Sequence, residues 1–273
     1  MSVEPFQKLD SRVRVRAMCV ALDKKHARVR AHTHTHTHTH THTHTHTQVL
    51  NNTIRDGSDG GIVVHNNARA TVKGNTISGN KKAGITLCTG ASAIVTENTI
   101  LGGKGAGILC HTDSGGVLRG NRISQVEKAG VEIRKRASTE VLANVIFNCS
   151  AQGVHVHSEG KGNIEGNTIS KCKGPLVEIC GASAPVLKHN QLEGGVGGAQ
   201  GFLVYDRACP EIANNILKDC PKAGIHISDG ALPTGIHTHY IYIYIYIYIV
   251  CVCVCVCVCV CVCVCVCNIH LFI

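Results

Sequence analysis

A repeat of 23 residues runs through the middle of the chain and limits strongly what the chain can fold into. Each copy contains an Asn that is followed two residues later by Ile or Leu. The first seven copies are spaced by 23 residues and the eighth by 25, and their Asn are Asn52, Asn75, Asn98, Asn121, Asn144, Asn167, Asn190 and Asn215. A fixed period of this size is typical of a solenoid, in which each repeat buries its apolar face only against its neighbours.

Four columns of the aligned repeats are apolar almost throughout. In order along the repeat they are Val49, Val72, Val95, Leu118, Val141, Ile164, Leu187 and Ile212; Ile54, Ile77, Ile100, Ile123, Ile146, Ile169, Leu192 and Leu217; Ile62, Ile85, Ile108, Val131, Val154, Val177, Phe202 and Ile225; and Val64, Leu87, Cys110, Ile133, Val156, Ile179, Val204 and Ile227. The last two columns are two residues apart and rich in β-branched residues, which is typical of strands. No repeat has a helix-length stretch without Gly or Asn, and the Leu framework of leucine-rich repeats is missing. We therefore predict an all-β fold, a parallel β-helix of about eight 23-residue coils.

The Asn column is expected to have a structural role. Strands of neighbouring coils lie about 4.8 Å apart, so Asn amides on successive coils can stack and hydrogen-bond along the axis. A Gly follows most of these Asn after nine residues, and we expect it to need either a positive φ or a close backbone approach at a corner. The residues at this position are Gly61, Gly84, Gly107, Gly130, Gly153, Leu176, Gly201 after a two-residue insertion, and Gly224.

Most of the positive charge lies outside the repeats. The formal net charge is +9 over 273 residues, but residues 48–234 contain 19 Lys and Arg against 15 Asp and Glu, a net charge of +4. Nucleic-acid binding favours a concentrated basic patch and often aromatic stacking, so we expect no nucleic-acid partner. Residues 1–10 lack an apolar core, so we expect no secretory signal.

Three segments alternate strictly between two residue types. Residues 32–47 alternate His and Thr, residues 240–249 Tyr and Ile, and residues 250–267 Val and Cys. Alternating CA, TA and TG dinucleotides encode these patterns, so our hypothesis is that the runs are microsatellite or intron sequence and that the natural β-helix continues on both sides. A transcript joining residue 48 to another repeat would support this, and a peptide spanning residues 249–252 would contradict it.

The predicted organisation follows from these boundaries. Residues 1–47 form a low-complexity segment, residues 48–234 a parallel β-helix domain, and residues 235–273 a low-complexity apolar tail. We expect no physiological metal site in the His run or among the tail Cys. Residues 240–267 are long enough to span a bilayer, but their alternation favours an aggregation-prone strand over a membrane anchor.

Eight further Cys are scattered over the rest of the chain, at positions 19, 88, 110, 149, 172, 180, 209 and 220. None forms a close CxxC pair. We therefore expect reduced thiols in an intracellular protein, located in the cytoplasm or nucleus.

Outward positions of the strand after the Gly are the candidate functional positions. The first outward column is Val63, Thr86, Leu109, Glu132, His155, Glu178, Leu203 and His226, and the second is His65, Cys88, His111, Arg134, His157, Cys180, Tyr205 and Ser228. The most polar and reactive patch combines Glu132, Arg134, His155, His157, Glu178 and Cys180. It is compatible with a catalytic site, a binding surface or a plain ionic ladder. Its two Glu are expected about 9.6 Å apart, near the upper end for inverting glycosidases.

The second column also resembles a metal ribbon, because His65, His111 and His157 recur every two coils and Cys88 and Cys180 lie in the same column. Nothing in the sequence closes a tetrahedral shell around these ligands, and no Asp cluster on neighbouring coils favours calcium. We therefore predict no metal site and no cofactor.

Residues 129–135 (AGVEIRK), 160–169 (GKGNIEGNTI) and 181–190 (GASAPVLKHN) show two alternating coil styles with a 46-residue superperiod. This pattern resembles the right-handed parallel β-helix domain shared by carbohydrate-binding proteins and sugar hydrolases, and within that group most of all the β-helix region of F-box-only proteins. The resemblance covers residues 48–234. It implies a β-helix that recruits substrates to a cullin-type ubiquitin ligase, although neither an F-box nor the zinc-binding domain of such proteins is recognisable here.

The leading prediction is a non-enzymatic protein-interaction domain, the substrate-recruiting part of an F-box-type ubiquitin ligase adaptor. Its partner would be a protein substrate of the ligase, bound at the patch defined above. The alternative is a carbohydrate-active or polysaccharide-binding β-helix of the lyase or hydrolase kind. Aromatic platforms for sugar stacking are scarce, since the repeats contain only Phe147, Phe202 and Tyr205, and this argues mildly against the alternative.

Overall fold

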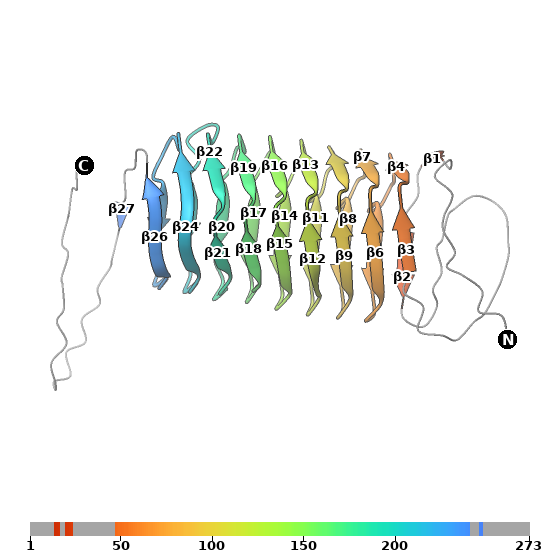
Figure 1. The fold of residues 1–273 in the computed structure, drawn as a ribbon, viewed down its shortest axis with the longest axis horizontal. Helices are drawn as coiled ribbons and strands as arrows, with labels where there is room; N and C mark the ends of the chain where they lie inside the picture. Colours follow the sequence, from red (N-terminus) through yellow and green to blue (C-terminus); the bar gives the residue numbers. More distant parts are fainter. Residues whose placement is uncertain (1–13, 17–19, 24–46, 241–245, 248–273) are drawn as a thin grey trace.

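A computed structural model of the chain describes residues 14–16, 20–23, 47–240 and 246–247. The described residues form strands that stack as successive rungs along one axis (Figure 1). This part of the chain contains no helix, and accordingly none that is long and apolar enough to cross a membrane. The predicted parallel β-helix is confirmed, because every strand pair is parallel and partners on successive regular coils are 23 residues apart.

One side of the solenoid is a sheet of ten strands, one from each coil, and it follows chain order without crossovers. Its strands are β2 (Val20–Asp23), β5 (Ile62–His65), β8 (Ile85–Cys88), β11 (Ile108–His111), β14 (Val131–Arg134), β17 (Val154–His157), β20 (Val177–Ile179), β23 (Phe202–Val204), β25 (Ile225–Ile227) and β27 (Tyr246–Ile247).

The rest of the wall is a sheet of 17 strands in two rows. One row contains β3 (Thr47–Leu50), β6 (Arg69–Lys73), β9 (Ser92–Thr96), β12 (Gly115–Arg119), β15 (Ser138–Leu142), β18 (Asn163–Glu165), β21 (Val186–Lys188), β24 (Glu211–Lys218) and β26 (Thr234–Tyr240). The other contains β1 (Arg14–Arg16), β4 (Thr53–Arg55), β7 (Thr76–Ser78), β10 (Thr99–Leu101), β13 (Arg122–Ser124), β16 (Val145–Phe147), β19 (Thr168–Ser170) and β22 (Gln191–Glu193). The two rows join at β24, which pairs with both β21 and β22.

The core is one continuous apolar column inside the coils. The four predicted inward columns are at most 1% exposed, except for Ile227 in the last of these coils, which is partly buried. Small residues complete the column, among them Ala70, Ala91 and Ala137. Each coil therefore buries its apolar side chains between two neighbours, which is how a solenoid accumulates stability.

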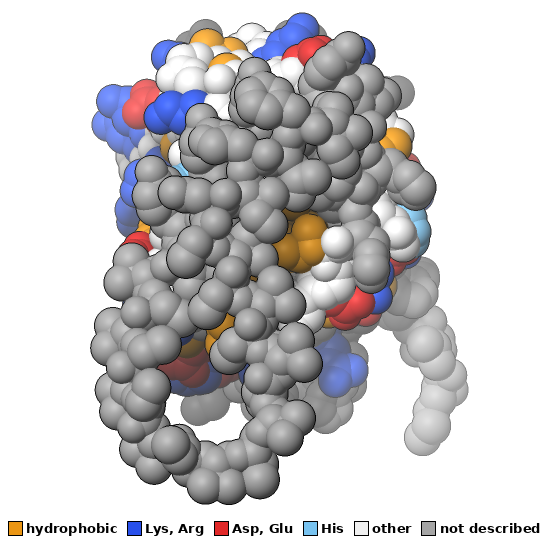
Figure 2. All heavy atoms as spheres, turned by 90° about the vertical axis from the view of Figure 1, so that its left-hand side faces the viewer, with side chains coloured by type: hydrophobic (Ala, Val, Ile, Leu, Met, Phe, Trp, Pro, Cys, Tyr) orange, Lys and Arg blue, Asp and Glu red, His pale blue; other side chains and the backbone are white. Residues whose placement is uncertain are grey.

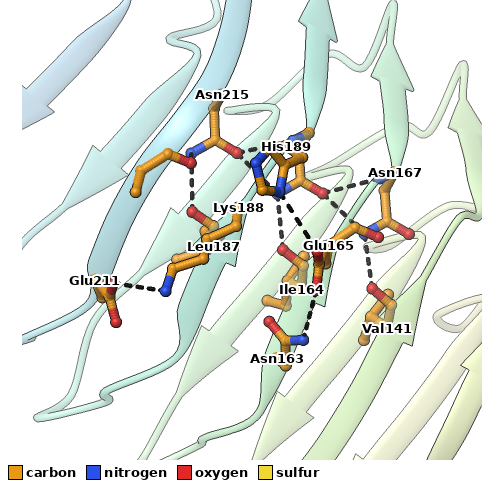
Figure 3. Close-up of polar contacts among 12 residues, drawn as sticks. Val141, Asn163, Ile164, Glu165, Asn167, Leu187, Lys188, His189, Glu211 and Asn215 are labelled. Carbon is orange, nitrogen blue, oxygen red and sulfur yellow. Dashed lines mark hydrogen bonds and ion pairs between the residues drawn. The ribbon is translucent and has the colours of Figure 1, made fainter. Parts of the chain in front are cut away.

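The predicted Asn ladder is present at one corner. From Asn52 to Asn190, each Asn donates its backbone N–H and its amide NH₂ to the Oδ1 atom of the next Asn, over 2.8–3.2 Å. Each amide also reaches a backbone carbonyl of its own or the previous coil. Figure 3 shows this for Asn167 and Asn215, whose Nδ2 atoms lie 2.8 Å from the Val141 carbonyl and 2.9 Å from the Leu187 carbonyl. The buried polar groups of the corner are thereby paired.

The repeated Gly are required for close approach and not for a positive φ. A Cβ on Gly107 would lie 2.6 Å from the carbonyl oxygen of Gly130 on the next coil and even closer to the Ile123 side chain. Gly84, Gly130 and Gly153 meet the same two kinds of neighbour, and none of these Gly has a positive φ. Of the two reasons expected from the sequence, crowding between coils is the one that applies.

Coil stacking extends beyond residues 48–234 at both ends. Near the N-terminus, β1 pairs with β4 and β2 pairs with β5. Near the C-terminus, β26 pairs with β24 and β27 with β25. The rest of the His-Thr run (32–46) and the whole Val-Cys run (250–267) lie outside the described residues, so their interpretation stays a hypothesis.

Candidate functional site

The six predicted site residues lie together on the outer side of the ten-stranded sheet. They belong to three consecutive coils and are Glu132 and Arg134 of β14, His155 and His157 of β17, and Glu178 and Cys180 at β20. Strand register places Glu132, His155 and Glu178 side by side in one row. It places Arg134 beside His157 in the next row. The intervening residues of β14 and β17 are buried, so strand alternation turns these polar side chains outward.

Glu132 organises the first half of the cluster. Its Oε1 atom lies 3.3 Å from Nε2 of His157 and 3.2 Å from Nε of Arg134. The Arg134 N–H does not point at the carboxylate, so this contact is an ion pair without a hydrogen bond. The hydrogen bond with His157 lowers the pKa of Glu132; burial opposes this effect, and the Arg134 charge adds to it. Glu132 is therefore a stable anion at neutral pH.

Glu178 organises the second half and is more deeply placed, with only 8% of the residue exposed. Its Oε1 atom accepts a hydrogen bond of 2.8 Å from the Tyr205 hydroxyl, and Oε2 accepts one of 2.6 Å from the Gln152 amide. Nε2 of His155 lies 3.8 Å from Oε1 and also 3.8 Å from the Cys180 sulfur. Two neutral donors thus fix the carboxylate beside an imidazole and a thiol.

The two imidazoles join the two halves. His155 and His157 stack with ring centroids 4.3 Å apart and ring planes inclined by 26°. Burial lowers the pKa of His155 more than the adjacent Glu178 carboxylate raises it. Burial is also the main cause that raises the pKa of the Cys180 thiol. At neutral pH the centre of the cluster therefore presents a neutral imidazole and a protonated thiol between two carboxylates.

Two contributors were missed by reasoning from sequence. Tyr205 was placed in the outward column but not in the site, and Gln152 was not considered. A signal for Gln152 exists, because the two preceding coils have Ala106 and Ala129 at this position just before the corner Gly, where Gln152 has a long polar side chain. A change from Ala to a long polar side chain at this position indicates a specific contact.

The column that contains these His and Cys residues does not form a continuous metal ribbon. His111 is in register with Cys88 and Arg134, but its Nδ1 atom contacts the Thr112 hydroxyl at 2.8 Å. Burial and, after it, the neighbouring Arg134 and Lys135 charges lower the pKa of His111. Among the described residues, a group of three potential ligands forms only at His155, Glu178 and Cys180.

Charges on the rest of the surface are mixed. In the end-on view of Figure 2, Lys and Arg side chains are interspersed with Asp and Glu around the visible rim. Several surface Lys and Arg form ion pairs with Asp or Glu on an adjacent coil. Figure 3 shows one such pair, in which the Lys188 amine lies 2.7 Å from the Glu211 carboxylate. Exposed pairs of this kind contribute little to stability. The expectation of no nucleic-acid partner stays a prediction.

Comparison with known proteins identifies related sequences and folds. The family model described as the right handed beta helix region matches residues 87–237, and the model of the periplasmic copper-binding protein NosD matches residues 13–140. Two solved structures of mutants of the periplasmic alginate epimerase AlgG share the fold, with TM-scores of 0.59 and 0.55 and 14% sequence identity in each case. The alignments cover 74% of this chain but only 51% and 50% of theirs, so the chain spans about half the length of these proteins. No curated protein sequence matches the chain.

Two predictions from the sequence are wrong. The similar proteins are NosD and an alginate epimerase, which contradicts the F-box-type ubiquitin ligase adaptor and its ligase-substrate partner. Both proteins are periplasmic by name, which also contradicts a cytoplasmic or nuclear location. The stretches that suggested F-box proteins follow the coil period, so they specify the coil and leave function open. The predicted right-handedness is confirmed by the family match. Because the family model matches more than half of this chain, the chain belongs to the right-handed β-helix family.

Proposed function

We propose that this chain is an extracytoplasmic, carbohydrate-active β-helix that binds a polysaccharide across the outer face of the ten-stranded sheet. The observation that carries the proposal is the continuous polar cluster on three consecutive coils, flanked by Tyr205 on a fourth. The resemblance to proteins named for a periplasmic location, one of them an alginate epimerase, supports this class.

The geometry of the face suits an extended polymer. Successive coils place equivalent side chains about 4.8 Å apart, so a linear chain lying along the axis can contact several rungs. Glu132, His155 and His157 have side chains that are only 14–22% exposed, which holds them in fixed orientations. Sugar hydroxyls both donate and accept hydrogen bonds, and the cluster offers carboxylate acceptors together with guanidinium and imidazole donors. A preorganised surface of this kind loses little side-chain entropy on binding.

The electrostatics argue against Glu132 as the general acid of a hydrolytic pair of Glu. A glycosidase general acid needs a raised pKa so that it is protonated near neutral pH. Glu132 has a lowered pKa because of its hydrogen bond with His157, so it cannot serve as that acid in its present contacts. The proposal therefore concerns recognition of the polysaccharide by this face.

Binding is tested by calorimetry with soluble neutral glycans and polyuronates. The variant Glu132→Gln is expected to lower the affinity about tenfold or more, since a hydrogen bond to a charged group contributes about 1.5–3 kcal/mol. His155→Ala removes a neutral imidazole and should lower the affinity by a smaller factor, since an uncharged hydrogen bond contributes about 0.5–1.5 kcal/mol. Glu140→Gln is the matched control, because Glu140 is an exposed Glu of β15 on the other sheet. No binding to any glycan, or equal losses in all three variants, would refute the proposed site.

Location is tested separately by fractionation of cells that express the full-length natural gene with a C-terminal tag. The proposal expects the protein in the extracytoplasmic fraction. Recovery in the cytosolic fraction alone would remove the support that the periplasmic relatives give.

A further inference from the structure

We propose that His155, Glu178 and Cys180 form a binding site for a borderline-soft divalent metal ion of the Zn²⁺ class. Each residue offers one ligand atom, namely imidazole Nε2, carboxylate Oε1 and thiol Sγ. This differs from the expectation from sequence that no metal site would form. It does not depend on the proposed polysaccharide binding.

The spacing of the three atoms fits a tetrahedral ion. All of them lie within 4.8 Å of one another, and His155 Nε2 lies 3.8 Å from both the carboxylate oxygen and the sulfur. Zinc bonds of about 2.0–2.3 Å imply ligand separations of about 3.3–3.6 Å around a tetrahedron. Shifts of a few tenths of an ångström in each side chain would therefore close the site. Nitrogen, oxygen and sulfur are also the ligand types that zinc takes in proteins.

An independent observation is the charge imbalance at Glu178. Its carboxylate is almost fully buried, yet its hydrogen-bond donors are a Tyr hydroxyl and a Gln amide. Among the described residues, no Lys or Arg forms an ion pair with it, whereas Glu132 has Arg134 beside it. A buried anion is costly unless a cation compensates it or it coordinates a metal. A divalent ion at this position would supply the missing charge.

The surroundings of Glu178 also resemble the outer shell of a metal site. Tyr205 and Gln152 hold the two carboxylate oxygens from different coils. Such outer-shell hydrogen bonds orient ligands, and their removal typically lowers metal affinity about 10- to 100-fold. With three protein ligands, one position of a tetrahedral ion stays open to water or to a bound molecule, as in catalytic zinc sites.

The test measures metal binding to the full chain without polysaccharide. The His-Thr and Val-Cys runs also contain potential ligands, so the informative quantity is the difference between variants that share both runs. Competition with a chromophoric chelator should show one more Zn²⁺ equivalent in the wild type than in His155→Ala, Glu178→Gln or Cys180→Ser. Cys209→Ser is the matched control, because Cys209 is exposed and lies outside the cluster, and it should bind as the wild type does.

Two further readouts separate a metal site from a merely structural role. The Co²⁺ difference spectrum of wild type minus Cys180→Ser should contain a thiolate-to-cobalt charge-transfer band. Tyr205→Phe should lower the affinity about 10- to 100-fold, which is less than the loss in any ligand variant. Circular dichroism checks that each variant is folded, and the near-isosteric Glu178→Gln and Cys180→Ser provide the test if His155→Ala unfolds. Equal stoichiometry and affinity in the wild type and in the folded ligand variants would overturn the proposal, and leave polysaccharide binding to be judged by its own titration.

Discussion

Asn144 offers a quantitative test of the ladder that aligns the coils. This residue is 1% exposed. Its amide donates to the carbonyls of Leu118 and Leu142 at 2.9 and 3.1 Å and to Oδ1 of Asn167 at 3.0 Å. Its own Oδ1 accepts from the backbone N–H and the amide of Asn121, both at 2.9 Å. One side chain therefore serves polar groups on three successive coils.

The substitution Asn144→Ala removes these contacts at once. The Asn121 amide keeps its bond to the Val95 carbonyl, but the buried N–H of Asn121 loses its acceptor and the Leu118 carbonyl loses a donor. Each buried polar group left without a partner costs about 1–3 kcal/mol, so we expect the free energy of unfolding to fall by about 2–6 kcal/mol. This is a large fraction of the stability of an ordinary domain.

The measurement is urea unfolding of the wild type, Asn144→Ala and the control Asn52→Ala. Asn52 begins the described ladder and is partly exposed, and its Oδ1 accepts from no other Asn of the described residues. Its removal leaves no buried polar group without a partner, so the free energy of unfolding should fall by less than about 1 kcal/mol. Similar losses for the two variants would refute the ladder argument and assign the effect to a local turn preference.

The isosteric variant Asn144→Asp separates hydrogen bonding from cavity formation. The Asp side chain fills the same space, but it places a carboxylate oxygen, which is an acceptor, where the Asn144 amide donates to the Leu118 carbonyl and to Oδ1 of Asn167. Relative to the wild type at the same pH, it should be destabilised more at pH 7 than at pH 4, because protonation restores one donor.

Three further results are expected. Since folding lowers the pKa of Glu132 below its ordinary 4.5, its ionised form should stabilise the fold above pH 4.5, and this contribution should be lost as the pH falls through the folded-state pKa; unfolding curves of Glu132→Gln should lack that part of the pH dependence. Gly107→Ala should lower the melting temperature more than Gly120→Ala. A Cβ at Gly107 would lie 2.6 Å from a carbonyl of the next coil, whereas one at Gly120, where φ is +62°, meets nothing within 4 Å and costs only the strain of a left-handed residue, about 1–2 kcal/mol; equal shifts would contradict the crowding argument. Phe202→Ala should cost about 3–5 kcal/mol in chemical unfolding, because Phe202 is fully buried.

The inward half of the molecule could be predicted almost residue by residue. Val49 and its equivalents recur at a fixed period because each packs between the equivalent residues of the coils on either side. The Asn at this period is equally constrained, since its amide must meet an identical amide one coil away. These residues interact with copies of themselves, so a single sequence contains both partners.

The outward half could be predicted only as a set of neighbours. Strand register brings residues 23 apart side by side, but the hydrogen bonds between coils of the cluster join residues 25–27 apart, such as His157 with Glu132 and Tyr205 with Glu178. These are diagonal contacts between adjacent strands, and they depend on side-chain rotamers that no core packing fixes. This is why the sequence suggested a row of Glu and His, and not two separate groups around two carboxylates.

The amino-acid sequence by itself determined the period, the inward columns and the Asn ladder, because each is a repeated contact between identical elements. Only the tertiary structure decided that the repeated Gly are needed for close approach between coils, which donors hold Glu178 and which three ligand atoms converge. Those outcomes depend on distances between coils and on side-chain directions, which vary from coil to coil while the core pattern stays the same.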